Sequence, residues 1–396
     1  MNSGLTQKIS YSVISTLICC GLILIYCSLY KKGKKIQFED LIICTLLVVI
    51  SSLRYGVGTD YFRYLEGASK WVRQFDSNIG SLFSNEIIQK YSFEIGYKLL
   101  SVLSNRISSS PYSIFWAVSI VTYIPVVVYC RKDTSDSRIA LAVYLLFGYW
   151  GISLNVIGQS IAMVMLLHAR SAFGRKRYVL AVLLLMCAVS FHASAIIAAI
   201  LIFLPKIPLA KFLTKASKRN LGKMIIIGIV ARGGVEILAN ALLRTVSFAR
   251  YTRYLSTGIS DIGSRIYIMF GALIETLLVI AILYMAINKL EKDKSSYPKL
   301  EELIPIVMLG IPFAIVGISR SDWLWLSIRF AEYFFIFLIA LIPELIDTSG
   351  EYVKRGVITI KRQRVQFWLA MIAWHAIFAM FMFNNNRFTI DTYLFK

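Results

Sequence analysis

The chain has 396 residues, of which 57% are hydrophobic and 16% are charged. A soluble protein of this composition would expose large apolar patches, so the composition excludes a soluble domain and favours a multi-pass membrane protein. The formal net charge of +21 does not indicate a nucleic-acid partner, because many of the basic residues gather in six clusters between apolar runs. The clusters are KKGKK (31–35), RKDTSDSR (131–138), GRKRY (174–178), residues 206–223, KLEKDK (289–294) and residues 354–364.

Apolar runs recur along the whole chain, and we expect about 12 spans, since a spanning helix needs roughly 20 mostly apolar residues. The first run is expected to be a retained helix and not a signal peptide, because no small-residue cleavage site follows it. If spans alternate in direction, all six basic clusters fall on one face, which is the positive-inside pattern. The sequence therefore predicts one all-α, polytopic integral membrane domain over residues 1–396. The expected spans lie at 10–30, 40–53, 111–130, 139–154, 156–173, 179–191, 193–205, 221–241, 265–287, 302–318, 323–346 and 366–383.

The second predicted span leads into RYGVGTDYFRY (54–64), which begins the longest non-spanning stretch, residues 54–110. We expect this stretch on the outer face, with short interfacial helices where aromatic, apolar and charged residues mix. Gly56 and Gly58 are not a dinucleotide loop, because they follow a membrane helix and not a strand. They are more typical of a tight turn or of a place where the backbone approaches a ligand.

Polar side chains in the same sequence form the first candidate site. An interfacial belt of tyrosines and snorkelling arginines explains Tyr61 and Tyr64 as well as a functional role does. It explains Arg54 and Asp60 together less well, because an outward helix end does not normally collect such a pair. The pair therefore indicates a site at the outer surface.

The apolar run from residue 179 to residue 205 is interrupted by SFHAS (190–194). One long helix would move the basic cluster at 206–223 to the outer face, whereas two short crossings keep it inside, so we expect two crossings. His192 then lies at the outward turn between them, where irregular backbone is tolerated only against protein or water. Histidine accepts a proton readily near neutral pH, which makes His192 a candidate base.

The predicted outer loop at 242–265 keeps four arginines, although the positive-inside pattern disfavours cations there. The planar guanidinium group matches phosphate oxygens in a way that a lysine does not. The cluster therefore indicates a lipid phosphate or pyrophosphate, and simple binding of lipid headgroups is the alternative. The four residues are Arg244, Arg250, Arg253 and Arg265, of which we single out Arg250 and Arg265.

Ionisable residues within the apolar runs are the remaining candidates, because they are expensive at membrane depth. Arg232 and Glu236 are four residues apart, and we expect them to pair structurally. Arg329 and Glu332 could also pair, but Tyr333 shares the helix face of Arg329, so we expect Arg329 to be functional. The other two histidines and the six cysteines show no zinc spacing and are expected to be packing residues. They are His168, His375, Cys19, Cys20, Cys27, Cys44, Cys130 and Cys187.

Several sequence pieces, taken in order, resemble the EpsG-type polysaccharide polymerases, which are relatives of the Wzy class. The pieces span roughly residues 54 to 333, and RYGVGTDY is the most specific of them. The family pattern usually has an arginine before Gln159, where this chain has Gly158. The pieces are RYGVGTDYFRY (54–64), the segment with Ser92, Glu94, Gly96 and Tyr97, NVIGQSIA (155–162), FHASA (191–195) and a late arginine–tyrosine sequence that ends at Tyr333.

The resemblance implies a GT-C-like glycosyltransferase fold in the bacterial inner membrane, with a periplasmic active face. Such polymerases transfer a growing glycan from one undecaprenyl pyrophosphate carrier onto the next lipid-linked repeat unit, and a separate chain-length regulator is an implied partner. Preorganised arginines can stabilise the leaving pyrophosphate, and no carboxylate cluster has the spacing for a divalent ion. We therefore expect an inverting enzyme that uses neither a metal nor another cofactor.

The resemblance and the residues together give a set of expected site residues. The candidate bases for the acceptor hydroxyl are His192 and Asp60. The residues expected to bind substrate or pyrophosphate are Arg54, Arg250, Arg265, Arg329, Gln159, Glu94, Tyr61, Tyr64 and Tyr333. Two other functions stay open. One is an O-antigen ligase, which would be expected to carry its histidine in a large late outer loop. The other is a flippase for lipid-linked oligosaccharide, which would be expected to show internal repeats.

Overall fold

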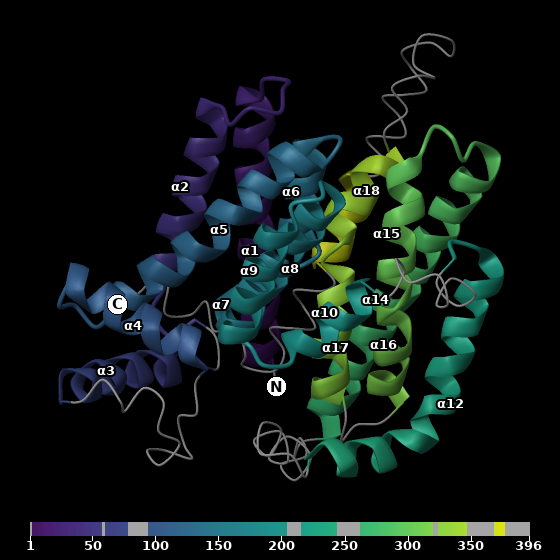
Figure 1. Ribbon diagram of the computed structural model, residues 1–396. Helices are drawn as coiled ribbons and strands as arrows, with labels where there is room; N and C mark the ends of the chain where they lie inside the picture. The colour runs from purple at the N-terminus through teal and green to yellow at the C-terminus, as the bar shows by residue number, and fades with distance from the viewer. Residues whose placement is uncertain are drawn as a thin grey trace. The chain divides into compact units, whose positions relative to one another are not determined.

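The computed structural model describes residues 2–57, 60–77, 94–203, 215–243, 262–319, 324–346 and 368–376. Within these ranges the chain is helical and contains no strand, as the apolar runs predict (Figure 1). The helices are α1 (Asn2–Leu29), α2 (Phe38–Ser52), α3 (Tyr61–Ser77), α4 (Ile95–Ile107), α5 (Ser113–Asp133), α6 (Ser137–Leu146), α7 (Tyr149–Asn155), α8 (Ile157–Gly174), α9 (Tyr178–Phe191), α10 (Ala195–Phe203), α12 (Lys218–Leu243), α14 (Ile262–Lys292), α15 (Pro298–Met308), α16 (Gly310–Ser319), α17 (Leu324–Phe335) and α18 (Leu338–Ile346).

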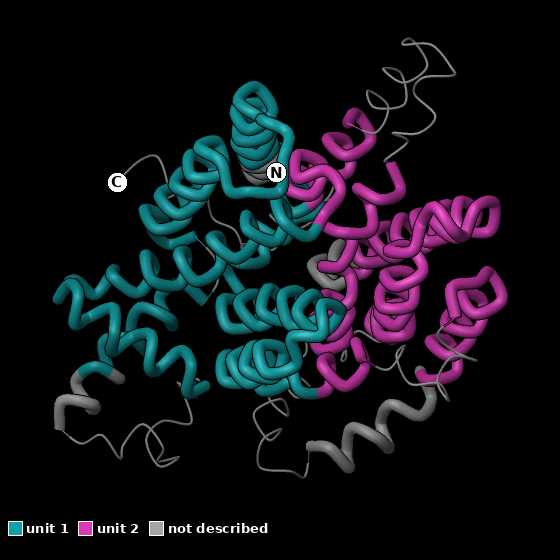
Figure 2. The backbone as a smooth tube through the Cα atoms, turned by 45° about the horizontal axis from the view of Figure 1, so that its top comes forward, with its two compact units in different colours: residues 1–133, 144–196, 385–396 teal, residues 134–143, 197–384 magenta. Residues whose placement is uncertain are grey.

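The chain divides into two compact units, which Figure 2 shows in different colours. The described residues of unit 1 fall within 1–133 and 144–196, and those of unit 2 fall within 134–143 and 197–384. One boundary follows the last residue of α5, and two others pass through α6 and through the first turn of α10. Residues 54–64 and 190–194, which the sequence singles out, therefore all belong to unit 1.

Three helical stretches are long and apolar enough to cross a membrane, and two bent helix pairs pass the same test of length and composition. The described residues thus contain three candidate spans, or up to five if each bent pair is one span. All five coincide with predicted spans, whereas the total of about 12 stays a prediction. The three single stretches are Ser113–Asp133, Met269–Lys292 and Pro298–Ile318, and the pairs are α6 with α7 (bent by 51°) and α17 with α18 (bent by 44°).

Unit 1 is a bundle of two pairs of helices, which are joined by the packing of α5 on α8 and by α4. One pair is α8 with α9 and the other is α2 with α5, while α4 packs against both α5 and α9, and α3 packs on α4. Apolar side chains fill the α2–α5 contact, where Ile43, Leu47, Phe115 and Val118 are all buried. In a membrane, where lipid tails are as apolar as these side chains, close van der Waals packing of this kind holds helices together. This arrangement sets the start of α4 beside the end of α9.

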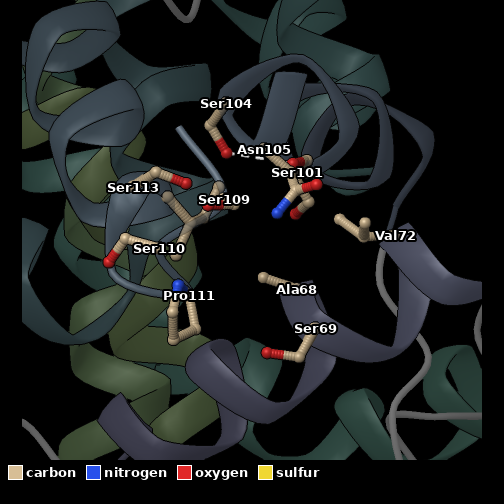
Figure 3. A pocket seen from close by; sticks show the side chains of 11 residues that line it. Ala68, Ser69, Val72, Ser101, Ser104, Asn105, Ser109, Ser110, Pro111 and Ser113 are labelled. Carbon is tan, nitrogen blue, oxygen red and sulfur yellow. Dashed lines mark hydrogen bonds between the residues drawn. The ribbon is translucent and has the colours of Figure 1, made fainter. Parts of the chain in front are cut away.

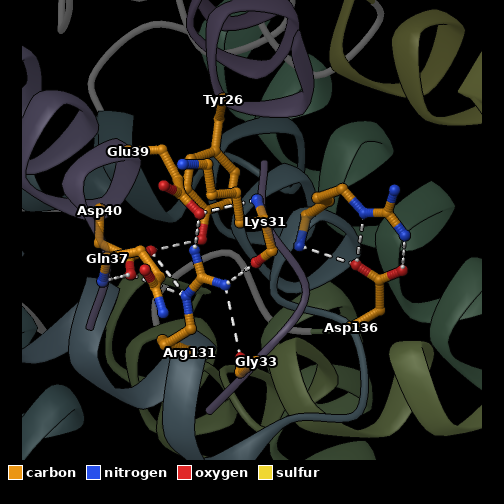
Figure 4. Close-up of polar contacts among 9 residues, drawn as sticks. Tyr26, Lys31, Gly33, Gln37, Glu39, Asp40, Arg131 and Asp136 are labelled. Atoms are coloured by element: carbon orange, nitrogen blue, oxygen red, sulfur yellow. Dashed lines mark hydrogen bonds and ion pairs between the residues drawn. The ribbon is translucent and has the colours of Figure 1, made fainter. Parts of the chain in front are cut away.

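A buried polar network joins α1, α2 and α5 at one end of unit 1 (Figure 4). Arg131 of α5 donates from Nε to Asp40 at 2.7 Å and from Nη2 to Glu39 at 2.9 Å. The Tyr26 hydroxyl donates to Asp40 at 2.6 Å, and Arg131 Nη1 donates to the Lys31 carbonyl oxygen at 2.7 Å. A buried charge is tolerated when it is paired and hydrogen-bonded in this way. The network therefore fastens the α1–α2 connection to the end of α5.

Basic clusters that are distant in the sequence come together within each unit. In unit 1, Arg131 contacts the backbone of KKGKK, and Arg175 of GRKRY donates a hydrogen bond to Asp133. In unit 2, Lys218 of the 206–223 cluster pairs with Glu291 of KLEKDK at 2.9 Å. Each unit thus has an end at which basic clusters gather, an arrangement that fits the positive-inside pattern.

Helices α2 and α9 lead from this basic end to the opposite end of unit 1. Helix α9 begins after Arg177 and ends before His192, and its 14 residues separate the two by about 21 Å. Helix α2 begins after Gln37 and ends next to Leu53 and Arg54. The two stretches around Arg54 and His192 therefore lie at the end of unit 1 away from its basic clusters.

Candidate functional site

His192 and Glu94 form a hydrogen bond although 98 positions separate them in the sequence. Nδ1 of His192 lies 2.9 Å from Oε1 of Glu94, and the two side chains are 16% and 15% exposed. An ionised carboxylate can only accept, so Nδ1 carries the proton, and Nε2 is the nitrogen that accepts a proton whenever the ring is neutral. The backbone N–H of Ala193 points at the same carboxylate oxygen at 3.4 Å. This is an imidazole oriented by a carboxylate.

Helix ends place both partners of this pair. The break predicted at SFHAS is confirmed, because α9 ends at Phe191 and α10 begins at Ala195. His192 occupies the C-cap of α9 with extended backbone, φ −154° and ψ 112°. Glu94 occupies the N-cap of α4, also in an extended conformation. The pair is therefore fixed by two helix ends that meet.

Two glycines allow this meeting of helix ends. A Cβ atom on Gly96 of α4 would lie 2.9 Å from the carbonyl carbon and oxygen of Ser190. A Cβ atom on Gly158 of α8 would lie 2.6 Å from the carbonyl oxygen of Phe191. Interiors this closely packed have no room for an added side chain, and backbone atoms cannot rotate away. Packing therefore leaves no room for a larger side chain at Gly158 or at Gly96.

Asp60 is tied to the same region through Asn155. Its backbone N–H donates to Oδ1 of Asn155 at 3.2 Å. Asp60 directly precedes α3, and its side chain is half-buried. Asn155 is the last residue of α7, three positions before Gly158, which contacts Phe191 next to His192. The α7–α8 junction therefore contacts Asp60 through Asn155 and the end of α9 through Gly158.

Arg54 and Tyr61 form a packed wall on α5. Arg54 is buried, donates from Nη1 to the Ser51 carbonyl oxygen at 2.8 Å, and lies 4.8 Å from the ring centroid of Phe115. Tyr61 is 1% exposed and stacks on the same ring at 4.5 Å. Burial, with smaller contributions from neighbouring groups, raises the pKa of Tyr61 to about 12, so this phenol stays protonated and is no base. Gly56 makes the preceding turn with φ +69°, a conformation that favours glycine.

Tyr64 joins the two short helices of the segment. The hydroxyl of Tyr97 on α4 donates to the Tyr64 carbonyl oxygen on α3 at 2.8 Å, and the two ring centroids are 5.2 Å apart. Tyr97 is buried, whereas Tyr64 is half-buried and keeps part of its ring accessible. Because Tyr97 stands one turn after Glu94, this contact couples the helix that follows Asp60 to the helix that carries Glu94.

The other expected site residues are not brought to this group by any described contact. Gln159 is buried in α8, where Nε2 donates to Sδ of Met163 at 3.7 Å. Arg329 and Tyr333 lie on α17 in unit 2, and Tyr333 is buried. Arg265 lies in the first turn of α14 with its side chain outside the described part, and Arg250 lies wholly outside the described residues.

Two features of this site do not follow from the sequence. Glu94 is expected there as a substrate ligand and not as the partner of His192, and Asn155 has no expected role. Both residues stand in the sequence pieces quoted for the family resemblance, which was the available signal. Spacing within a piece does not reveal contacts between pieces, so the pairing of Glu94 with His192 depends on the fold.

A comparison with protein families gives a match to the EpsG family over residues 40–394, nearly the whole chain. The matched range includes every site residue described above. Comparisons with curated proteins and with solved structures found no match. The apolar helices and the family match both indicate a membrane protein. The chain therefore belongs to the EpsG family, a family of Wzy-type polysaccharide polymerases.

Proposed function

We propose that this protein polymerises undecaprenyl-pyrophosphate-linked oligosaccharide repeat units during synthesis of O-antigen, capsule or exopolysaccharide. It transfers the growing glycan from its lipid carrier onto the next lipid-linked unit at the periplasmic face. Family membership supports the polymerase role, and the hydrogen bond between Glu94 and His192 is the observation that carries the chemistry.

In the proposed reaction, a sugar hydroxyl of the incoming unit attacks the anomeric carbon of the growing chain. The new glycosidic C–O bond forms as the C–O bond to lipid pyrophosphate breaks, with inversion at that carbon. The hydroxyl proton passes to Nε2 of His192, because Glu94 engages Nδ1 at 2.9 Å and orients the ring. Asp60 accepts a hydrogen bond from the acceptor sugar beside this base.

The leaving pyrophosphate needs charge stabilisation more than it needs an acid. Preorganised guanidinium groups supply this stabilisation without a metal ion, and their bidentate geometry fits phosphate oxygens. We assign this role to the expected arginines, with Gln159 as a neutral contact and with Tyr64 and Tyr333 at the sugar or lipid. The arginines are Arg54, Arg250, Arg265 and Arg329.

The distribution of charge supports an outward orientation of the site. Basic clusters gather at one end of unit 1, and His192 lies about 21 Å from Arg177 along α9. The positive-inside rule assigns basic ends to the cytoplasm, so the opposite end with His192 faces outward. The lipid-linked substrate then has its pyrophosphate at the interface and its glycan in water.

A deletion strain tests this function against the two alternatives. It is expected to accumulate single-repeat lipid-linked units on the outer face and to lose the glycan ladder. The wild-type protein restores the ladder, and a His192→Gln variant at equal protein level does not. Units that accumulate on the inner face would instead indicate a flippase. Full-length polymer that stays on its carrier would indicate a ligase, and either result overturns the proposal.

A further inference from the structure

A cleft of about 180 Å³ lies between α3, α4 and the start of α5 in unit 1 (Figure 3). Six of its eleven lining residues are serines, and none of the described residues that line it is charged. We call it the serine cleft. Its polar lining consists of Ser69, Ser101, Ser104, Asn105, Ser109, Ser110 and Ser113.

The hydrogen bonds of these serines leave acceptors free for a ligand. Ser69, Ser101 and Ser104 donate their hydroxyl protons to carbonyl oxygens of their own helices, at 3.1, 2.8 and 2.9 Å. A hydroxyl oxygen that has donated its proton can still accept. Half-buried Ser69 presents such an acceptor, whereas Ser101 and Ser104 are 1% and 4% exposed and line the floor of the cleft. The half-buried amide of Asn105 adds two donors and an acceptor. The cleft therefore suits a neutral ligand with many hydroxyl groups and offers no charge to an anion.

An adjoining groove supplies a surface of the opposite kind. It shares Ser104, Ser110 and Ser113 with the cleft and is walled by Tyr112 and Trp116, which are 43% and 39% exposed. Aromatic rings present flat apolar faces with a polar tip. A sugar ring has hydroxyl groups around its edge and C–H groups on its face, so the two surfaces match the two parts of one sugar.

The position of the cleft relates it to the candidate site. Glu94, Tyr97, Ser101 and Ser104 follow one another at spacings of three, four and three, which places them on one face of α4. The rise of an α-helix puts Ser101 and Ser104 about 10 and 15 Å from Glu94 along the axis. One face of α4 thus begins at the Glu94–His192 pair and ends in the cleft.

We propose that the serine cleft binds an uncharged sugar residue of the glycan, one that lies some distance from the reacting sugar. This inference rests on the proposed polymerase function for the identity of the glycan. The cleft is smaller than the roughly 300 Å³ at which pockets for drug-sized ligands begin, so it takes one ring and not a long chain. It acts by binding and takes no part in the transfer step.

The test uses the purified full-length protein in detergent, with one defined probe. The probe is the free oligosaccharide released by mild acid from the producing strain's own lipid-linked repeat units. The double variant Asn105→Leu/Ser110→Leu removes two hydrogen-bonding groups. Asn105 is half-buried and Ser110 is exposed, so both positions tolerate leucine. It is expected to bind the probe about tenfold more weakly, because two neutral hydrogen bonds are lost. Ser109→Trp, which fills the cleft from an exposed position, is a second variant with the same expected result.

Two controls separate this inference from the proposed function. Ser28→Leu changes an exposed serine of α1 that does not line the cleft, and it is expected to bind normally. His192→Gln is expected to bind the probe normally and to form no polymer. Unchanged binding in both cleft variants, or failure of the wild-type protein to bind the released oligosaccharide, overturns the inference even if polymerisation is intact. Loss of binding in the cleft variants with no polymerase activity in the wild-type protein would overturn the function and leave the cleft standing.

Discussion

At the scale of single residues, the Glu94–His192 pair makes the most specific chemical prediction. If Glu94 acts by orienting His192, then removing either group removes the same function. We expect His192→Gln to lower the polymerisation rate by about a hundredfold or more, and Glu94→Gln to lower it by a similar factor. The measurement is the initial rate of polymer formation by purified protein in lipid vesicles.

The double variant distinguishes a positioning role from a structural one. Residues that act as a unit are strongly non-additive, so Glu94→Gln/His192→Gln should be no slower than His192→Gln alone. Glu66→Gln changes an exposed carboxylate on α3 and is the matched control, with an unchanged rate. Independent, multiplying losses would show that Glu94 does not act through His192.

Asp60 supports a second prediction at this scale. Its backbone is held by Asn155 and its side chain is half-buried, so Asp60→Asn is nearly isosteric and should leave the fold intact. Under the proposed role it should greatly reduce the glycan ladder, while single repeats still reach the surface. Asp293→Asn, at an exposed position in the α14–α15 connection, is the matched control. A normal ladder from Asp60→Asn at equal protein level would remove Asp60 from the site.

Part of this site could be predicted from the sequence. Arg54, Asp60 and His192 stand out because each lies in an apolar run or in the segment directly after one, where such polar side chains are not expected. Glu94 gives no such signal on its own, since a glutamate in a polar segment is ordinary. Its importance comes from a contact over 98 positions, which depends on how α4 and α9 pack.

At the scale of helices, α8 approaches the end of α9 so closely that a residue larger than glycine at position 158 should destabilise the protein. Gly158→Ala would place a methyl group 2.6 Å from the Phe191 carbonyl oxygen and should destabilise the protein by about 1–3 kcal/mol. Gly21→Ala in α1 meets nothing within 4 Å, so it should be neutral or slightly stabilising, because alanine favours helices over glycine. Thermal unfolding in detergent compares the two. Equal melting temperatures would contradict the close contact.

The Arg131 network supports a prediction about the attachment of α2 to α5. Removing one partner of a buried ion pair leaves an uncompensated charge, so Arg131→Ala should lose about 3–5 kcal/mol of stability. Lys132→Ala changes the exposed neighbour and should stay within about 0.5 kcal/mol of the wild type. The readout is again thermal unfolding, and a similar effect of both variants would count against the network.

The pH dependence of stability, compared between the wild type and Arg131→Ala, tests whether Arg131 acts through its ion pair with Glu39. Burial alone would raise the pKa of Glu39, but hydrogen bonds from the Lys31 N–H and the Arg131 guanidinium outweigh it and lower this pKa below its ordinary 4.5. A lowered pKa means that the stabilisation is present above pH 4.5 and is lost as the pH falls through the lowered value. The wild type should therefore lose more stability than Arg131→Ala between neutral pH and about pH 3.5.

At the scale of the whole molecule, the one-sided gathering of basic clusters predicts the topology. Single cysteines replacing Lys32, Lys176, Lys215 and Lys294, in a background without the six native cysteines, should react with reagents only from the cytoplasm. A cysteine at Ser77, the last residue of α3, should react from outside. An outside reaction at Lys215 would show that residues 179–205 cross once, and would displace His192 from its outward turn.

The all-helical class and the helix break at His192 were predictable because apolar length and its interruption are local properties of the sequence. The bends inside two predicted spans were not, since Gly148 and the Phe335–Leu338 turn interrupt runs that stay apolar throughout. The division of contacts into two units was also unforeseen. It depends on which helices pack together, and the apolar face of a helix does not specify which other helix packs against it.

Arg131 has one role while the chain is inserted and another after it has folded. The positive-inside rule acts while the chain is being inserted, when the loops of each span are still unpaired and every lysine and arginine counts toward orientation. After folding, Arg131 is 1% exposed and is matched by two carboxylates, so it no longer presents charge to the membrane surface. The same side chain thus helps to choose the direction of a helix early and joins three helices later. Replacing it by lysine would preserve the first of these uses and weaken the second, because only arginine carries the planar fork that reaches several acceptors at once.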